Sequence, residues 1–205
     1  MGRILFVLFL LVLPYPAFSA APDSGQIMIG KDEVLRGHFV EERNLKGFNG
    51  PTKSTGHFVI APERGLIWSV EKPFSTTTVI TPAGLMTSID GKKVVNLPAQ
   101  KIPFMLHLYE MLGGTLAGNW QAMEKDFTVT RSGDTQNWQV VLTPRDSENP
   151  AMPFNSITVT GSRYVEKVVL EKPEGDTDTI TFIDQVAAPM PLSAAENAAF
   201  SSLHP

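Results

Sequence analysis

The side chains that could carry out acid–base or metal chemistry are scattered along this sequence. Glu41 and Glu42 are adjacent in a candidate strand, so their carboxylates point to opposite faces and do not form an acid–base pair. His107, Tyr109 and Glu110 share a candidate helix, but consecutive helical residues do not converge on one point. None of the histidines has the spacing typical of metal ligands. They are His38, His57, His107 and His204.

Common catalytic and cofactor-binding motifs do not appear in the sequence either. It has no G-x-S-x-G elbow, no H-E-x-x-H helix, no P-loop and no dinucleotide-binding fingerprint, and it contains no cysteine. We therefore expect no catalytic residues, no bound metal and no cofactor, and we predict that the protein is not an enzyme.

A stripe of apolar side chains is the stronger signal. In GLIWSVEKPF, residues 65–74, a period of two places Leu66, Trp68 and Val70 on one face of a strand that stops at Pro73. A strand with such a face buries it against another surface. That surface belongs either to the protein's own core or to a bound ligand.

The elements around this segment are mostly further strands. The connections APERG, KPF, TPAG, IDGKK, RSGDTQN and TGSR contain turn residues and separate short segments rich in Val, Ile, Thr and aromatic residues. Short connections indicate antiparallel neighbours, and hence a mainly β meander that curls into a large sheet or barrel. The eleven candidate strands span residues 35–45, 54–61, 65–71, 75–81, 85–89, 93–97, 127–131, 138–143, 155–160, 164–171 and 178–184.

Two helices accompany the strands. The segment 102–114, IPFMLHLYEMLGG, has Pro103 in its first turn and two glycines as a stop. It is apolar on nearly every side, so it must be covered on more than one side. Ser193 and Glu196 have the spacing of a capping box and predict a short C-terminal packing helix.

Side chains of the sheet and of segment 102–114 are candidates to line one apolar space. One interpretation is a packed core with the helix as its plug. The other is a cavity for acyl chains, in which each buried CH₂ contributes about 0.8 kcal/mol. A closed sheet of this many strands is wider than side chains alone fill, which favours a cavity. The candidate lining residues are Phe58, Leu66, Trp68, Val70, Ile80, Phe104, Met105, Leu108 and Met111.

The N-terminus has the features of a secretory signal peptide. Arg3 precedes an unbroken apolar run, residues 4–13, which is followed by prolines and small residues. The run is about half as long as a membrane-spanning helix. We expect residues 1–20 to be removed on export and residues 21–205 to form a single domain. Because the chain lacks cysteine, it has neither a lipid-anchor site nor disulfides, and we expect a free, soluble periplasmic protein.

Charge and length narrow the class of protein further. The formal net charge is −4, and it becomes −5 without Arg3 because the first twenty residues contain no acidic residue. With no basic block, nucleic acid is not an expected partner. About 185 residues suffice for one core, and we expect a monomer.

Several strings, in their order and spacing, resemble the LolA-type periplasmic carriers of outer-membrane lipoproteins. They are RGHFVEE from Arg36, GHFVIAPERGLIWSVEKP from Gly56, TPAGL from Thr81, IPFML from Ile102 and LTPR from Leu142. The resemblance extends from about Leu35 to Asp184. It implies an incomplete eleven-stranded antiparallel β-barrel, a half-barrel as in LolA and LolB, with a helical lid over an apolar cavity. This agrees with the strand count and favours the cavity over the packed core.

The resemblance departs from the family pattern at the lid. In the family an arginine directly before a proline ties the lid shut, whereas this chain reads Ala61, Pro62, Glu63, Arg64. Arg64 is therefore a candidate latch displaced into the turn, with a solvated turn residue as the alternative. The chain also looks like a divergent branch whose cargo need not be a lipoprotein.

The function that the resemblance implies is transport of a lipidic cargo without covalent chemistry. The protein would take lipoprotein acyl chains, or a related lipid product, from an inner-membrane donor such as a transporter and pass them to an outer-membrane acceptor. Contact with the membranes would be transient and made through these partners. The alternatives are a lipid-sensing module that regulates a partner, and a cofactor-free enzyme on the same fold.

Overall fold

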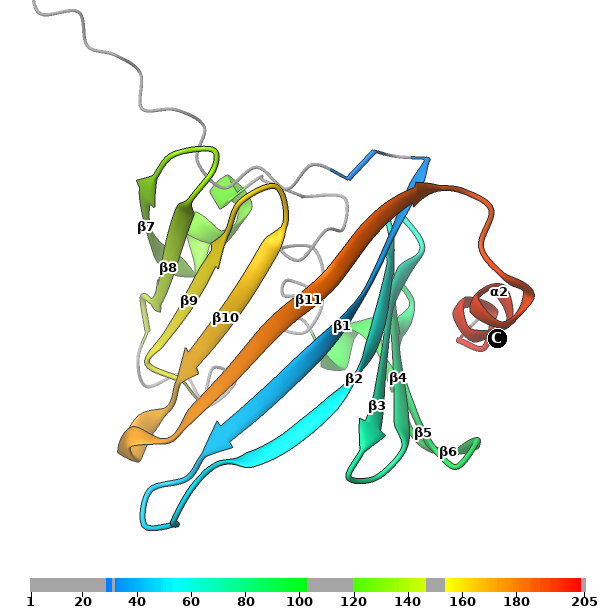
Figure 1. The fold of residues 1–205 in the computed structure, drawn as a ribbon, viewed down its shortest axis with the longest axis horizontal. Coiled ribbons are helices and arrows are strands. Elements are labelled where there is room, and N and C mark those ends of the chain that lie inside the picture. Colours follow the sequence, from blue (N-terminus) through cyan, green and yellow to red (C-terminus); the bar gives the residue numbers. More distant parts are fainter. Residues whose placement is uncertain (1–28, 31, 103–119, 147–153, 204–205) are drawn as a thin grey trace, which may run out of the picture.

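The main element of the computed structural model is one antiparallel sheet (Figure 1), and the model describes residues 29–30, 32–102, 120–146 and 154–203. The strand order is β6-β5-β4-β3-β2-β1-β11-β10-β9-β8-β7. The strands are β1 (Glu33–Asn44), β2 (Thr52–Ala61), β3 (Gly65–Lys72), β4 (Thr76–Thr81), β5 (Gly84–Ile89), β6 (Lys92–Pro98), β7 (Phe127–Gly133), β8 (Trp138–Pro144), β9 (Ser156–Gly161), β10 (Val165–Glu171) and β11 (Thr177–Pro189).

The sheet confirms the eleven strands and the antiparallel meander expected from the sequence. It is open, because its order runs from β6 to β7 and these two edge strands do not pair. Every neighbouring pair is antiparallel, and β1 pairs with β11 to join the two ends of the chain. The half-barrel prediction is thus confirmed: the strands form an incomplete barrel rather than a closed one.

Alternation of apolar residues decides which face of the sheet each side chain occupies. In β8 the side chains of Trp138, Val140 and Leu142 are buried, while those of Gln139 and Thr143 are exposed. Register shifts between Arg36 and His38, opposite β11, mark a bulge, and bulges bend a strand and increase its twist. The sheet therefore curves, and one face becomes concave.

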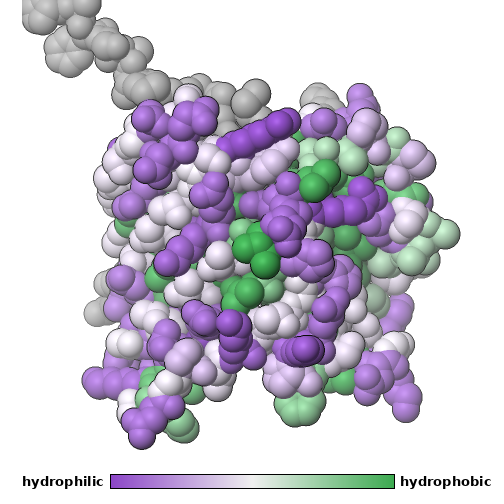
Figure 2. Space-filling model, viewed as in Figure 1, coloured by the Kyte–Doolittle hydropathy of each residue, from purple (hydrophilic) through white to green (hydrophobic). Residues whose placement is uncertain are grey.

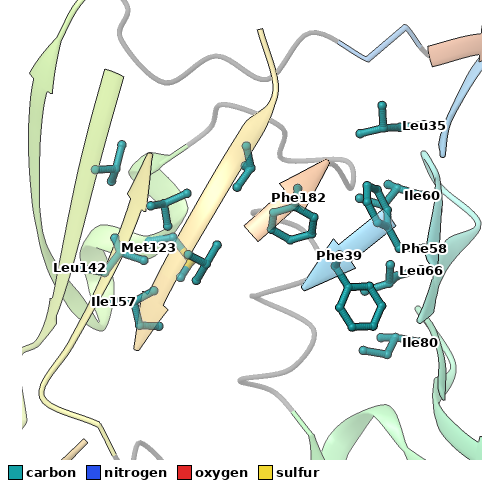
Figure 3. Packing of buried hydrophobic residues seen from close by; sticks show 14 of the residues in the cluster. Leu35, Phe39, Phe58, Ile60, Leu66, Ile80, Met123, Leu142, Ile157 and Phe182 are labelled. Carbon is teal, nitrogen blue, oxygen red and sulfur yellow. The ribbon is translucent and has the colours of Figure 1, made fainter. Parts of the chain in front are cut away.

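The concave face, which we call the inner face, carries the larger apolar cluster. Figure 3 shows Leu142 and Ile157 from one half of the sheet pointing toward Phe39, Leu66 and Ile80 of the other half. The buried members of this cluster are Leu35, Phe39, Phe58, Ile60, Leu66, Ile80, Leu85, Ile102, Met123, Phe127, Trp138, Val140, Leu142, Phe154, Ile157, Val159, Val165, Val168 and Phe182.

The opposite, outer face carries a smaller cluster beneath the C-terminal helix α2 (Ala194–Ser201). Ser193 caps α2, with the Ser193 side chain accepting from the Glu196 backbone N–H and the Glu196 side chain accepting from the Ser193 backbone N–H. The predicted capping box and packing role of this helix are therefore confirmed. The buried residues of the outer cluster are Val34, Val59, Ala61, Ile67, Val79, Met86, Leu192 and Phe200.

Among the described residues, the other helical segments are three short 3₁₀ turns, η1 (Ala99–Lys101), η2 (Trp120–Lys125) and η3 (Pro173–Gly175). Of the helix expected over 102–114, only Ile102 lies within the described residues, where it is buried in the inner cluster. In the part of the chain that the structure describes, no helix has the length and apolar character needed to cross a membrane.

Candidate functional site

Four aromatic rings form a connected group on the inner face. The rings of Phe39 and Trp68 stack with their centroids 3.7 Å apart. The Phe182 ring meets Phe58 edge to face at 5.2 Å and Trp68 at 6.0 Å. Such ring pairs stabilise the fold beyond the burial of their apolar area, so this group is a packed apolar surface in the middle of the sheet.

Two glycines make room for these rings. Gly56 pairs with Phe39 across β1 and β2, and a Cβ placed on Gly56 would lie 1.9 Å from the Ser69 carbonyl oxygen and 2.9 Å from the Phe39 ring. Gly37 pairs with Phe58, whose ring would lie 2.8 Å from a Cβ on Gly37. A Cβ at either position would crowd a ring, and at Gly56 also the backbone, so the glycines let Phe39 and Phe58 lie close against the neighbouring strand.

The sequence-predicted lining residues that are described all lie on the inner face. Phe58, Leu66 and Ile80 are buried members of the inner cluster, and Trp68 and Val70 are partly buried and pack against it. Ile67 and Ser69, which alternate with them along β3, face the outer side of the sheet, as the period of two predicts. Binding of a ligand by these residues remains a prediction. The candidates Phe104, Met105, Leu108 and Met111 lie outside the described residues.

The inner face also contains residues that the sequence analysis did not select. Phe39 and Phe182 complete the aromatic group, and the apolar residues of β8 and β9 supply the facing half of the cluster. The signal was present in the alternation of Leu35, Gly37 and Phe39, and in that of Trp138, Val140 and Leu142. Local alternation does not indicate that both halves of the sheet face the same space.

Charged side chains lie along the edge of the inner face, where β1 ends and β11 begins. Asp178 is buried, and its carboxylate accepts from Arg43 Nε at 2.9 Å and from Lys172 Nζ at 2.6 Å. Arg43 Nη2 also donates to Glu41 Oε1 at 3.3 Å. These four side chains neutralise one another, so the rim is polar without a net charge.

Arg64, the candidate latch, contacts the C-terminal helix. Its Nη2 lies 3.5 Å from Asn197 Oδ1, and its guanidinium carbon lies 5.8 Å from the centroid of the Phe200 ring. These contacts place Arg64 against α2 on the outer face. Because residues 103–119 of the expected lid are not described, the latch role remains a prediction.

A groove of about 580 Å³ lies on the outer face between α2 and the strands β11, β1, β2 and β3. His38 and His57 are directly opposite each other in it, on β1 and β2. His38 Nδ1 lies 3.9 Å from Asp184 Oδ2, and His57 Nδ1 lies 2.9 Å from Glu71 Oε1. Among the described residues, no group of three or more His, Asp or Glu side chains is arranged to hold a metal ion.

An ion pair fixes α2 beside this groove. Arg36 Nε and Nη2 donate to the two carboxylate oxygens of Glu196 at 2.7 and 2.8 Å. The hydrogen bonds from Arg36, opposed by burial and reinforced by the donors of Ser193, lower the pKa of Glu196 from 4.5 to about 2. The same pair raises the pKa of Arg36 above its ordinary value. Both groups are therefore charged across the whole physiological range.

A match to a family model identifies the family to which the chain belongs. A model described as outer membrane lipoprotein carrier protein LolA-like matches residues 17–195. The chain belongs to this LolA-like family. The open eleven-stranded sheet agrees with the fold that the sequence resemblance implied. No curated protein matches the chain.

Solved structures similar to this LolA-like chain have low sequence identity. A LolA superfamily protein from Nitrosomonas europaea is 9% identical, with a TM-score of 0.45 over 86% of this chain and 94% of that chain. A putative outer membrane lipoprotein-sorting protein domain from Vibrio parahaemolyticus is 8% identical, with a TM-score of 0.40 over 83% and 92%. A chain in the complex of MucA and MucB from Pseudomonas aeruginosa is 13% identical, with a TM-score of 0.43 over 80% and 55%.

Proposed function

We propose that this LolA-like protein is a periplasmic carrier that binds the acyl chains of a lipoprotein, or a related lipid product, on its inner face. It takes this cargo from an inner-membrane donor and delivers it to an outer-membrane acceptor. Membership of a family described as lipoprotein carriers supports the proposal. Binding is non-covalent, and no catalytic step is part of it.

The observation that carries the proposal is the continuous apolar inner face. The aromatic group of Phe39, Phe58, Trp68 and Phe182 lies at its centre, and aliphatic side chains from both halves of the sheet extend it to either side. Acyl chains bind such surfaces through loss of exposed apolar area, at about 25 cal/mol per Å². The polar part of a cargo would then contact the charged side chains around Asp178 at the edge of this face.

The distribution of polar side chains favours a carrier over an enzyme. The described histidines of the sheet, His38 and His57, lie on the outer face, away from the apolar cluster. The polar groups beside the inner cluster include Thr78 and Thr87, whose hydroxyls lie 3.0 Å apart. Hydroxyls without a neighbouring base are weak nucleophiles. The described part of this face thus offers a surface for binding and no evident acid–base pair.

Mass spectrometry of co-purified lipid tests the proposal. The protein is isolated from its native periplasm without detergent, extracted with organic solvent, and compared with an unrelated periplasmic protein of similar size treated in the same way. We expect an acylated species enriched in the extract of this protein. Extracts with the same lipid content from both proteins would contradict the proposal. Transfer of the bound species to acceptor vesicles then separates a carrier from a sensor that retains its lipid.

A further inference from the structure

Three consecutive hairpins end at the same end of the sheet. They connect β1 to β2, β3 to β4 and β5 to β6 (Figure 1, lower edge). Arg43 pairs with Thr52, whereas Lys72 at the end of β3 pairs with Thr55. Three residues of β2 therefore run past the end of β3, so the first hairpin projects roughly 10 Å further than the second.

Each hairpin exposes a large apolar side chain at or beside its turn. Phe48 is 73% exposed, Phe74 is 78% exposed and Ile89 is 43% exposed. The turn at Phe48 is defined by a hydrogen bond from its backbone N–H to the Leu45 carbonyl oxygen at 3.1 Å. Figure 2 shows apolar side chains at separate points along the lower edge of the molecule. Phenyl groups held this far from the rest of the protein contribute little to its core.

The residues around these side chains are basic. The hairpin segments 44–53, 71–75 and 89–93 contain five lysines and two acidic residues, a net charge of +3, whereas the whole chain has a net charge of −4. The lysines are Lys46, Lys53, Lys72, Lys92 and Lys93, and the acidic residues are Glu71 and Asp90. Lys53 Nζ lies 3.7 Å from Glu42 Oε1, and Lys93 Nζ donates to the Ser202 carbonyl oxygen at 3.0 Å, so the basic character rests on the other three lysines, one on each hairpin. The neighbouring β10–β11 turn contains Glu174 and Asp176, and Asp176 Oδ1 accepts from the Lys46 backbone N–H at 2.8 Å, so acidic side chains border the first hairpin on this side.

We propose that these three hairpin tips, the tip surface, dock directly onto an anionic lipid bilayer. Phe48 and Phe74 enter the interfacial region, where aromatic rings are favoured, and Lys46, Lys72 and Lys92, one on each hairpin, face the lipid phosphates. A protein partner would need a contiguous patch of about 800 Å² on this surface, whereas the exposed apolar groups here stand on separate turns. A lipid surface accepts separate points of insertion.

This inference goes beyond the carrier function, in which membrane contact is made through partners. The tip surface lies at the ends of the strands, and the proposed cargo surface lies on the inner face. Direct docking would hold the protein with its strand ends against the bilayer. Cargo binding is measured without membranes, so either proposal can fail while the other stands.

Site-specific fluorescence tests the docking, because the chain has no cysteine of its own. Single-cysteine variants Phe48→Cys and Phe74→Cys are labelled with an environment-sensitive dye. Val186→Cys is the control, since Val186 is 61% exposed but lies on β11 opposite Arg36, toward the other end of the sheet. The exported, processed chain is used, because the apolar run at residues 4–13 would itself bind vesicles. Vesicles of phosphatidylcholine with 30% phosphatidylglycerol are compared with pure phosphatidylcholine.

We expect dye fluorescence to rise at positions 48 and 74 with anionic vesicles, and to stay unchanged at position 186. In unlabelled protein, each of Phe48→Ser and Phe74→Ser should lower the vesicle partition coefficient about tenfold. Val186→Ser should leave it unchanged. No rise at either tip, or an equal rise at position 186, would overturn the docking surface. Equal binding to neutral vesicles would overturn the role of the lysines.

Discussion

Arg36 and Glu196 join β1 to α2 through two hydrogen bonds of 2.7 and 2.8 Å, although 160 positions separate them in the sequence. The same carboxylate accepts from the Ser193 backbone N–H at 2.6 Å and completes the capping box. One side chain thus both starts the C-terminal helix and fixes it on the outer face. The position of α2 depends on the charge of Glu196.

Acid should weaken the attachment of α2. The pKa of Glu196 is about 2 in the folded protein, below its ordinary value of 4.5, so proton binding favours the unfolded state. The stabilisation is complete above pH 4.5 and is lost as the pH falls from 4.5 toward 2. We expect it to amount to about 1 to 2 kcal/mol, since Arg36 is partly exposed and solvent screens the pair. Urea unfolding at pH 6 and pH 3 measures the loss.

Two carboxamide variants control this experiment. At pH 6, Glu196→Gln should lose most of the roughly 1 to 2 kcal/mol that the Arg36–Glu196 pair contributes. At pH 3 its difference from the wild type should be smaller, because protonation has already removed part of the charge of Glu196 in the wild type. Glu42→Gln removes a carboxylate that lies 3.7 Å from Lys53 in an exposed pair, and should change stability little at either pH. An equal pH dependence in the wild type and Glu196→Gln would show that other groups cause the acid effect.

Gly56→Ala should destabilise the fold strongly. The added Cβ would lie 1.9 Å from the Ser69 carbonyl oxygen, so β2 and β3 would have to separate beneath the Phe39 ring. We expect a loss of about 3 kcal/mol in the free energy of unfolding, measured by urea titration. Gly50→Ala is the control: its φ of +87° costs about 1 kcal/mol, but its Cβ has open space. A loss no larger at Gly56 than at Gly50 would contradict the close packing of the aromatic group.

The strands could be read from the sequence because each is a local pattern. The alternation of Leu66, Trp68 and Val70, ended by Pro73, identified β3, and Ser193 with Glu196 located the start of α2. The end of β11 was wrong by five residues, since the strand was expected to stop at Asp184 but continues to Pro189. Asp184 adopts a left-handed φ of 54° within a bulge, and pairing with β1 continues beyond it.

The candidate site was only half predictable, because its remaining features are contacts between distant segments. Phe182 meets Phe58 only because β11 pairs with β1, and nothing local in either sequence segment indicates that pairing. The same holds for the contacts of Arg64 with α2, which lies more than a hundred positions away in the sequence, while its role as a lid latch stays a prediction. Periodicity assigns a side chain to a face, whereas curvature and long-range pairing decide what that face meets.

A matched pair of truncations separates cargo binding from stability. Leu66 and Ile67 are adjacent in β3 and both 5% exposed, but Leu66 faces the inner cluster and Ile67 lies beneath α2. We expect Leu66→Ala and Ile67→Ala each to cost about 2 to 4 kcal/mol in the free energy of unfolding. Only Leu66→Ala should weaken binding of an apolar fluorescent probe. Equal probe affinities for the two variants would show that the inner face is not the binding surface.

Displacement of an apolar probe from the wild-type protein tests the central claim most directly. The purified processed chain is titrated with a probe that fluoresces in apolar surroundings, then with a fatty acid or a lipopeptide, without membranes. The carrier account predicts saturable probe fluorescence that the acylated competitor removes, because both bind the inner face. A signal no greater than that of an ordinary folded protein would contradict the account, since an inner face filled by its own side chains leaves the probe no place to bind.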